Sequence, residues 1–249
     1  MNTQNASMAN SILITGVSQR LGFYCAMALA KAGCSVLGTY RDVKKNQENL
    51  VQLKEAGVEL IQAELATESG IAAFIEEVKR HCSGLRCIIH NASSWSKDMP
   101  DEAQSKQHAL AQALFNVHAI APYQINLALA PLLMQEAPSD IIHVTDYVVN
   151  AGSDHHIAYA ASKAALENMT KSFARRYAPK IKVNSIAPSL IMFNQNDDPT
   201  YREKALAKSL LGIEPGADVF FKTIQYLMDN PYLTGQTIQL EGGRSIRQS

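Results

Sequence analysis

The sequence predicts an α/β, Rossmann-like, doubly wound fold with a seven-stranded parallel sheet and helices on both faces. Two observations predict it: seven short apolar runs rich in β-branched residues, and longer segments of helical period that alternate with them. Because no linker or internal repeat divides the 249 residues, we expect one domain over 1–249 with a flexible N-terminus at 1–10.

Each short apolar run is predicted to be one buried strand of a parallel sheet. In chain order the strands occupy residues 11–15, 35–40, 58–62, 86–90, 141–145, 182–186 and 237–240. The helical segments between them include residues 20–32, 44–56, 68–81, 104–134 and 157–178. The polar, breaker-rich stretch at 194–200 favours a small helical substrate lid over about 189–211, and an inert surface loop is the alternative.

Composition and charge exclude several classes of protein. A hydrophobic content of 47% excludes a disordered chain, and 23 basic residues against 23 acidic ones create no field that attracts nucleic acid or a membrane surface. The start of the chain is polar and no apolar stretch approaches the roughly 18 residues of a membrane span, so we expect a cytoplasmic protein. The four cysteines lack metal-ligand spacing, and the adjacent His155 and His156 point apart, so no metal site is expected.

The turn after the first predicted strand is a candidate phosphate site. It runs from Thr15-Gly16 to Leu21-Gly22 and leads into a helix. Glycines let the backbone approach a phosphate closely, and the free N–H groups of a helix N-terminus bind it. Only two glycines stand where a dinucleotide-binding motif has three, so an ordinary tight turn is the alternative.

The end of the second predicted strand indicates which cofactor is used. Sheets that bind NAD place an acid there against the ribose hydroxyls, whereas this chain has Tyr40 followed by Arg41. Because a guanidinium suits a phosphate, Arg41 favours NADPH, and a solvated arginine in a turn is the alternative.

The strongest local pattern is Tyr159 followed four residues later by Lys163 at the start of a long helical segment. Residues four apart share a helix face, so the ammonium group is expected near the phenol. A nearby cation lowers the pKa of a phenol, which predicts a proton donor that works at neutral pH. The fifth predicted strand ends at Asp146, on the carboxyl edge where open α/β sheets bind ligands.

Five segments in this order resemble the short-chain dehydrogenase/reductase family over essentially the whole chain. They are the Thr15-Gly16 turn, His-Asn-Ala-Ser at 90–93, Tyr159 with Lys163, Val183-Asn184 with Pro188, and Thr-Gly-Gln at 234–236 leading to Glu-Gly-Gly at 241–243. The resemblance implies the predicted fold and an oxidoreductase activity.

Four positions depart from the common pattern of that family. Arg20 replaces a glycine of the first motif, Ser93 replaces a glycine after the fourth strand, Asp146 replaces the catalytic serine, and His118 replaces an asparagine. The first three changes resemble the pteridine reductases, whose second motif ends in Ser-Ser-aromatic as this one ends in Ser-Ser-Trp95. His118 is left with two interpretations, a buried core histidine or a member of the proton relay.

This resemblance implies NADPH-dependent reduction of a 7,8-dihydropterin such as 7,8-dihydromonapterin, weaker reduction of dihydrofolate, and a homotetramer. A flat pterin suits stacking on Trp95, and its polar edge suits Ser93, Arg20 and Asp146. The implied catalytic residues are Tyr159, Lys163 and Asp146. Those implied for the cofactor are Gly16, Arg20, Leu21, Gly22, Tyr40, Arg41, Glu64, Leu65, Asn91, Ala92, Ser93, Lys163, Pro188 and Ser189, and those implied for the substrate are Arg20, Ser93, Trp95, Asp146 and Tyr159.

Two other functions are weighed against this one. The first is a carbonyl or sugar-alcohol dehydrogenase of the same family, but a ketone substrate calls for the serine that Asp146 replaces. The second is an NADPH-binding sensor without catalytic activity, and a sensor needs neither Tyr159 nor Lys163.

Overall fold

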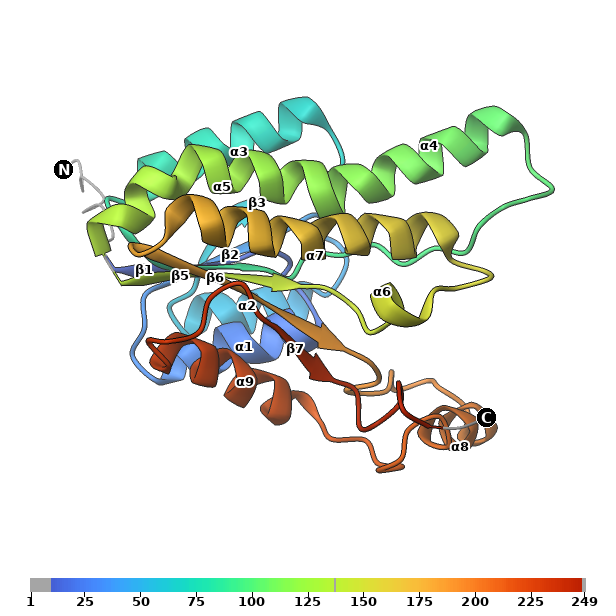
Figure 1. The fold of residues 1–249 in the computed structure, drawn as a ribbon. Helices are drawn as coiled ribbons and strands as arrows, with labels where there is room; N and C mark the ends of the chain where they lie inside the picture. Colours follow the sequence, from blue (N-terminus) through green and yellow to red (C-terminus); the bar gives the residue numbers. More distant parts are fainter. Residues whose placement is uncertain (1–9, 137, 248–249) are drawn as a thin grey trace.

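The computed structural model describes residues 10–136 and 138–247, and its centre is a sheet of seven strands (Figure 1). The strands are β1 Ser11–Ile14, β2 Val36–Tyr40, β3 Glu59–Gln62, β4 Leu85–His90, β5 Ser139–Val144, β6 Ile181–Pro188 and β7 Thr237–Leu240. Every neighbouring pair is parallel, and the order across the sheet is β3-β2-β1-β4-β5-β6-β7. The direction of winding therefore reverses between β1 and β4.

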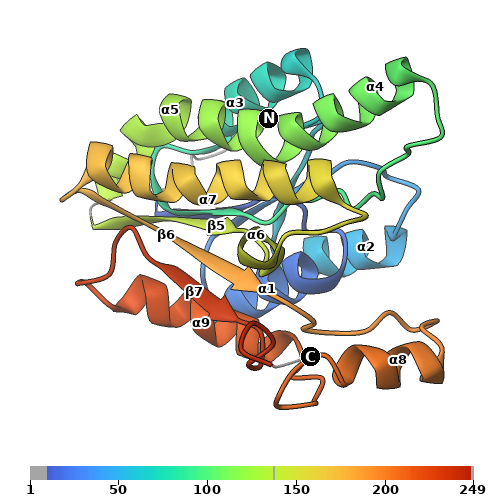
Figure 2. The ribbon, with the colours of Figure 1, turned by 45° about the vertical axis from the view of Figure 1, so that its right-hand side comes forward.

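Helices cover both faces of this sheet, as the two ribbon views show (Figures 1 and 2). The α-helices are α1 Arg20–Lys31, α2 Gln47–Glu55, α3 Glu68–His81, α4 Gln104–Phe115, α5 Ala121–Leu133, α6 Val148–Ala151, α7 Ile157–Tyr177, α8 Pro199–Leu206 and α9 Ala217–Asp229. A π-helical segment, η1 Asn116–Ile120, joins α4 to α5, and a short 3-10 segment, η2 Met134–Glu136, follows α5. One layer holds α3, α4, α5 and α7, and the other holds α1, α2 and α9.

The seven predicted strands and five predicted helices are confirmed, with bounds that differ by a few residues. The helix predicted from residue 44 begins at Gln47. The helix at Ala217–Asp229 was not predicted, although its apolar residues have helical spacing: Phe220, Phe221, Ile224 and Leu227. Of the four cysteines, Cys34 is exposed and Cys25, Cys82 and Cys87 are buried. Residues 1–9 of the expected flexible terminus lie outside the described residues.

Local sequence explains where two of the helices begin. The Thr67 hydroxyl accepts a hydrogen bond from the Gly70 N–H (3.2 Å) and caps α3, whose last turn carries three basic residues that suit its negative end. The Asp198 carboxylate accepts from the Tyr201 N–H (3.0 Å) and caps α8, and Pro199 occupies the first turn. Residues 189–206 thus form a loop followed by a short helix.

The helical stretch Gln104–Glu136 is long and apolar enough, by length and composition alone, to cross a membrane, contrary to the expectation that no apolar stretch approaches that length. Within its most apolar 18-residue window, however, 56% is buried inside the protein. Core helices of globular domains pass the same test, so this is weak evidence for a membrane span.

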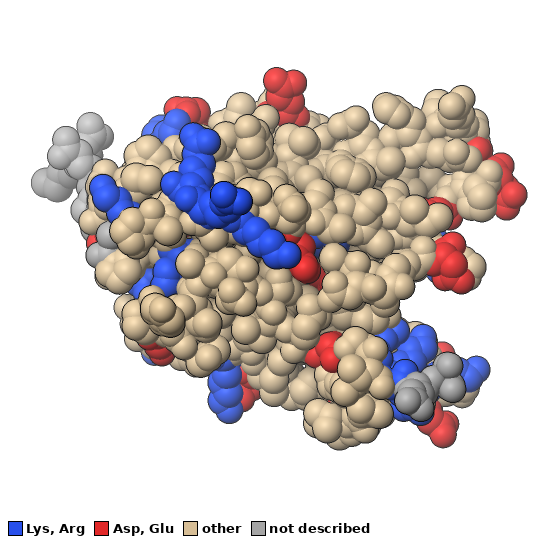
Figure 3. Space-filling model, in the orientation of Figure 1, with Lys and Arg blue, Asp and Glu red and all other residues tan. Residues whose placement is uncertain are grey.

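Charged side chains are unevenly spread over the face drawn in Figure 3. Lys and Arg gather over the C-terminal part of α7, whose last turn carries Arg175 and Arg176, and uncharged residues cover most of the rest. The outline is notched between the lobe that carries α8 and the main body.

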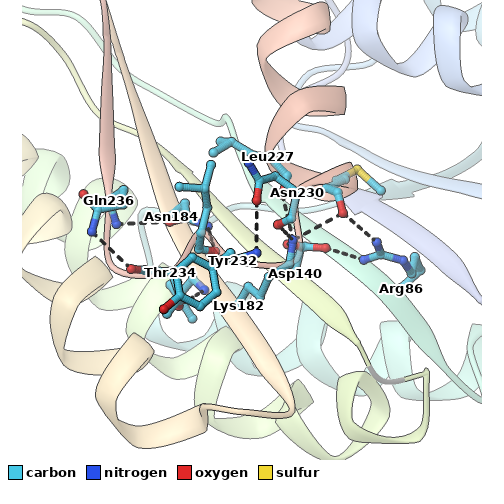
Figure 4. Close-up of polar contacts among 12 residues, drawn as sticks. Arg86, Asp140, Lys182, Asn184, Leu227, Asn230, Tyr232, Thr234 and Gln236 are labelled. Carbon is cyan, nitrogen blue, oxygen red and sulfur yellow. Dashed lines mark hydrogen bonds and ion pairs between the residues drawn. The ribbon is translucent and has the colours of Figure 1, made fainter.

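A buried ionic cluster ties α9 to the amino ends of the strands (Figure 4). The Asp140 carboxylate pairs with Lys182 Nζ (2.9 Å) and with the Arg86 guanidinium. Burial raises the pKa of Asp140, while the two cations act in the opposite direction. Lys182 also donates to the carbonyls of Leu227 (2.7 Å) and Asn230 (2.9 Å), which satisfies groups that the end of α9 leaves free.

Candidate active site

A cleft of about 780 Å³ opens at the carboxyl ends of the strands, where the winding reverses between β1 and β4. It collects residues from the ends of six strands, β1 to β6, and from α7. Of the residues predicted to bind cofactor or substrate, the cleft is lined by all but Ser189: Gly16, Arg20, Leu21, Gly22, Tyr40, Arg41, Glu64, Leu65, Asn91, Ala92, Ser93, Trp95, Asp146, Tyr159, Lys163 and Pro188.

The turn between β1 and α1 is held against the end of β4. Gly16 has φ +76°, and a Cβ there would lie 2.9 Å from the Cα of Ala92. A Cβ on Gly22 would lie 2.1 Å from the carbonyl oxygen of Gly16, so both positions require glycine. The Asn91 amide donates to the carbonyls of Thr15 (3.1 Å) and Gly16 (2.9 Å) and fixes the turn. No side chain caps α1 at its start, so its first N–H groups are open to a ligand at the cleft.

Arg20 connects this turn with the segment predicted to be a lid. Its φ of +54° is a conformation that favours glycine, the residue that the family pattern has at this position. Its guanidinium donates to the carbonyl of Met192 (2.9 Å) and to the side chain of Asn194. The loop before α8 therefore lies within reach of the cleft's edge, although its action as a lid stays a prediction.

Asp146, Tyr159 and Lys163 meet at the centre of the cleft. The Tyr159 hydroxyl donates to Asp146 Oδ2 (2.8 Å), and Asp146 Oδ1 accepts from the Val148 N–H (3.0 Å), which orients the carboxylate. Lys163 Nζ donates to the carbonyl of Val144 (2.8 Å) and lies 5.9 Å from the centroid of the Tyr159 ring. The spacing of four residues on α7 thus places the phenol and the ammonium group in one cleft, as predicted.

The proton affinities at this centre differ from the expectation. Burial raises the pKa of Tyr159 well above its usual value, and the adjacent Asp146 raises it further. The prediction that Lys163 lowers the pKa of this phenol is therefore wrong for this structure. Burial lowers the pKa of Lys163 itself to about 8, with Asp146 acting in the opposite direction. Tyr159 consequently stays protonated throughout the neutral range and acts as a hydrogen-bond donor.

Trp95 contributes an aromatic surface beside Tyr159. Its ring lies 4.0 Å from the His156 ring at 32°, and 4.7 Å from the Tyr159 ring at 74°. The side chain is 61% exposed even though it makes both contacts. A flat aromatic ligand in the cleft would therefore find an open indole surface next to the Tyr159 hydroxyl.

The segment that follows β2 contributes two basic side chains to the cleft. Tyr40, the exposed Arg41, Asp42 and Lys45 line it there, and Lys45 was not among the predicted site residues. The sequence could have indicated Lys45, because this base follows Arg41 by four residues. Two cations at one rim form a site suited to a phosphate group.

Ser189 lies elsewhere in the structure. It lines a second, more apolar cavity beneath α8, where its hydroxyl accepts from the Arg244 guanidinium (3.0 Å). That guanidinium also lies 4.1 Å from the centre of the Tyr147 ring. The structure thus does not bring Ser189 together with the other residues predicted for the cofactor. Within residues 10–136 and 138–247, no cluster of three or more His, Cys, Asp or Glu side chains could hold a metal ion.

Comparison with known proteins agrees with this geometry. A family model described as enoyl-(acyl carrier protein) reductase matches residues 16–245. The chain belongs to the short-chain dehydrogenase/reductase family. It is thus an oxidoreductase, and the pattern of five motifs identified the family correctly.

Individual relatives of this short-chain reductase carry more specific names. A dihydromonapterin reductase from Klebsiella pneumoniae is 48% identical over 238 residues, which cover 95% of this chain and 97% of the relative. One from an Enterobacter species is 48% identical over 237 residues, with coverage of 94% and 96%. A solved structure of FolM alternative dihydrofolate reductase 1 from Brucella suis, in complex with NADP, superimposes with a TM-score of 0.84 at 25% identity and covers 96% of each chain.

Proposed function

We propose that this protein is an NADPH-dependent reductase that converts a 7,8-dihydropterin, with 7,8-dihydromonapterin as the preferred substrate, into the tetrahydropterin. The observation that carries the proposal is the hydrogen bond from Tyr159 to Asp146 beside the open ring of Trp95. A carboxylate accepts hydrogen bonds from the N–H donors of a pterin edge, whereas a ketone offers it none. The near full-length similarity to dihydromonapterin reductases supports the same substrate class.

The residues of the cleft fit an NADPH molecule. The glycine turn and the uncapped start of α1 suit its pyrophosphate, and Arg41 with Lys45 suits a 2′-phosphate. The NADP-bound Brucella structure, with a TM-score of 0.84, supports this choice of cofactor. Bound nicotinamide would supply the hydride for C6 of the pterin. Lys163, within the same cleft, is the residue we assign to the ribose hydroxyls.

The remaining steps belong to side chains of this protein. Trp95 stacks on one face of the pterin, and Asp146, Ser93 and Arg20 bind its polar edge. Burial and Asp146 keep Tyr159 protonated, and its hydroxyl donates that proton to Asp146 Oδ2, so the pair holds one proton beside the substrate. We assign the route of the proton to N5 to Asp146, Tyr159 and water in the cleft.

Four further assignments are part of the proposal. The chain acts as one domain over 1–249, residues 189–211 act as a substrate lid that Arg20 contacts, and the protein assembles as a homotetramer in the cytoplasm. Dihydrofolate should be the poorer substrate, because its bulky side chain must pass the lid near 190–211. Light scattering of the purified protein measures the assembly directly.

The test is the oxidation of NADPH with a panel of substrates. We expect 7,8-dihydromonapterin to give a higher kcat/KM than dihydrofolate, and both to exceed simple ketones and secondary alcohols. Tyr159→Phe should lower kcat by roughly 100-fold while NADPH still binds. Tyr232→Phe, at a side chain that is 97% exposed, is the matched control and should change nothing. Efficient ketone reduction with no turnover of any dihydropterin would overturn the assignment.

A further inference from the structure

His118 is the one position among the four unusual ones whose role the proposed function leaves open. Its side chain is fully buried, and it lies in the π-helical segment Asn116–Ile120 between α4 and α5. Such π-helical turns are rare and frequently lie at functional sites. Its ring stands edge-on to the Tyr159 ring, with centroids 5.4 Å apart and planes at 89°.

Both ring nitrogens of His118 are hydrogen-bonded to residues that frame the cleft. Nε2 accepts a hydrogen bond from the backbone N–H of Ser94 (3.2 Å) and lies 3.0 Å from the hydroxyl oxygen of Ser93. Nδ1 lies 2.8 Å from the hydroxyl of Ser162 on α7. The Ser162 hydroxyl in turn donates to the backbone carbonyl of Tyr159 (2.7 Å). His118 therefore links the loop after β4 with the first turn of the catalytic helix.

The direction of these hydrogen bonds fixes the tautomer of the ring. A backbone N–H can only donate, so Nε2 must be the acceptor, and in a neutral imidazole the proton then sits on Nδ1. Nδ1 donates to Ser162, and the Ser93 hydroxyl donates to Nε2. Burial holds the ring neutral because it lowers the pKa of His118 to about 2, and the nearby Lys163 acts in the same direction.

This arrangement has a consequence for Ser93. The Ser93 hydroxyl is hydrogen-bonded to His118 Nε2 and also to the Tyr159 hydroxyl, an interaction that lowers the pKa of Tyr159. When its one proton is donated to Nε2, the lone pairs of its oxygen are left for Tyr159 and for the cleft that it lines. The chain of donors runs from Ser93 through His118 and Ser162 to the carbonyl of Tyr159, which takes up no proton at neutral pH. The chain is thus a scaffold, not a route for protons to the substrate.

We infer that His118 is a positioning residue that holds the Ser93 hydroxyl as a hydrogen-bond acceptor toward the substrate and ties it to the backbone of Tyr159. The inference rests on the proposed function for the identity of the substrate. An acceptor at Ser93 is complementary to the N–H donors on the edge of a pterin. His118 therefore contributes to substrate selection through Ser93 and transfers no proton itself.

The first test needs no catalytic activity. Protein labelled with ¹⁵N at histidine is measured by NMR between pH 6 and 8, and the His118 signals are assigned from their loss in His118→Gln. We expect a neutral ring with its proton on Nδ1 across the whole range. A proton on Nε2, or a charged ring, would overturn the inference whether or not the protein reduces dihydropterins.

The second test compares two variants in NADPH-dependent reduction of 7,8-dihydromonapterin. Gln has an acceptor and a donor at its end, so His118→Gln should stay within about threefold of the parent kcat/KM and keep its pH profile. His118→Phe keeps a ring but loses both contacts, and kcat/KM should fall about tenfold or more, chiefly through KM. If His118 carried a proton, the Gln variant would lose as much as the Phe variant and its pH profile would shift.

A double-mutant cycle separates positioning from general structural damage. Ser93→Ala should produce a similar rise in KM, and His118→Phe added to it should cause little further loss, because both remove the same acceptor. His143→Gln is the matched control, since it alters another fully buried histidine, whose hydrogen bonds to Asn126 and Thr170 lie away from the cleft. It should lower Tm without raising KM. Additive effects of the Ser93 and His118 changes would contradict the inference. If the parent protein reduces no dihydropterin, the proposed function fails while the NMR result still decides the role of His118.

Discussion

Lys163→Met should make the folded protein more stable while it abolishes activity. The Lys163 side chain is among the largest that are fully buried, and its ammonium group donates to the carbonyl of Val144 (2.8 Å). Burial lowers the pKa of Lys163 from 10.5 to about 8. At neutral pH the amine stays charged, because its pKa still lies above 7, and folding therefore carries the cost of burying that charge. Met has a similar length and no charge, so it removes that penalty.

The size of the effect follows from the pKa. At about 1.4 kcal/mol per pKa unit, lowering from 10.5 to about 8 corresponds to roughly 3 kcal/mol of destabilisation below pH 8. Loss of the hydrogen bond to the Val144 carbonyl lowers the free energy of unfolding by about 1 kcal/mol. The net gain in the free energy of unfolding is about 2 kcal/mol, which raises Tm by roughly 4–8 °C for a chain of this size.

The sign of the pH dependence gives a second check. The unfolded chain binds more protons at this position than the folded chain between pH 8 and 10.5, so the stability of the parent protein rises there with pH. The advantage of the Met variant is therefore full below pH 8 and disappears as the pH approaches 10.5.

Urea unfolding of the two ligand-free proteins at a series of pH values measures this directly. Lys171→Met, at an exposed lysine on the same helix, is the control and should shift stability by less than about 0.5 kcal/mol. A Lys163→Met variant that is less stable than the parent at pH 7, or an advantage that does not change with pH, would refute the reasoning.

Three further predictions concern the substrate, the cofactor and stability in acid. Trp95→Ala should raise KM for 7,8-dihydromonapterin about fivefold or more with little change in kcat, because it removes a stacking surface worth on the order of 1 kcal/mol; an unchanged KM would exclude stacking on this ring. Steady-state kinetics should show at least about tenfold preference for NADPH over NADH, and Arg41→Ala with Lys45→Ala should reduce it, whereas equal kcat/KM values in the parent protein would remove both residues from the cofactor site. Burial lowers the pKa of His90 from 6.5 to about 4, so the unfolded chain takes up this proton first as the pH falls. The stability should be intact above pH 6.5 and decline toward pH 4 by up to roughly 3 kcal/mol from this residue, and a urea midpoint that stays constant over that range would contradict it.

The sequence by itself determined the architecture and the family. Strands such as Ile181–Pro188 are runs of buried residues, and helices such as α3 carry their caps and terminal charges within a few residues of their ends, so local patterns are sufficient to find them. Tyr159 and Lys163 share one helix, and their spacing alone placed both in one site. The helix at Ala217–Asp229 was within reach of the same reasoning.

Only the tertiary structure decided the chemistry of the individual groups. The pKa of Tyr159 rises because burial and a carboxylate that approaches to 2.8 Å outweigh the hydrogen bond with Ser93, and neither the extent of burial nor that distance can be deduced from spacing along a chain. Likewise, His118 meets Ser93 and Ser162 across 25 and 44 residues of sequence, and Ser189 faces Arg244 instead of the cleft. Periodicity records which face of an element is buried, whereas proton affinity and hydrogen-bond direction depend on partners that packing brings from distant elements.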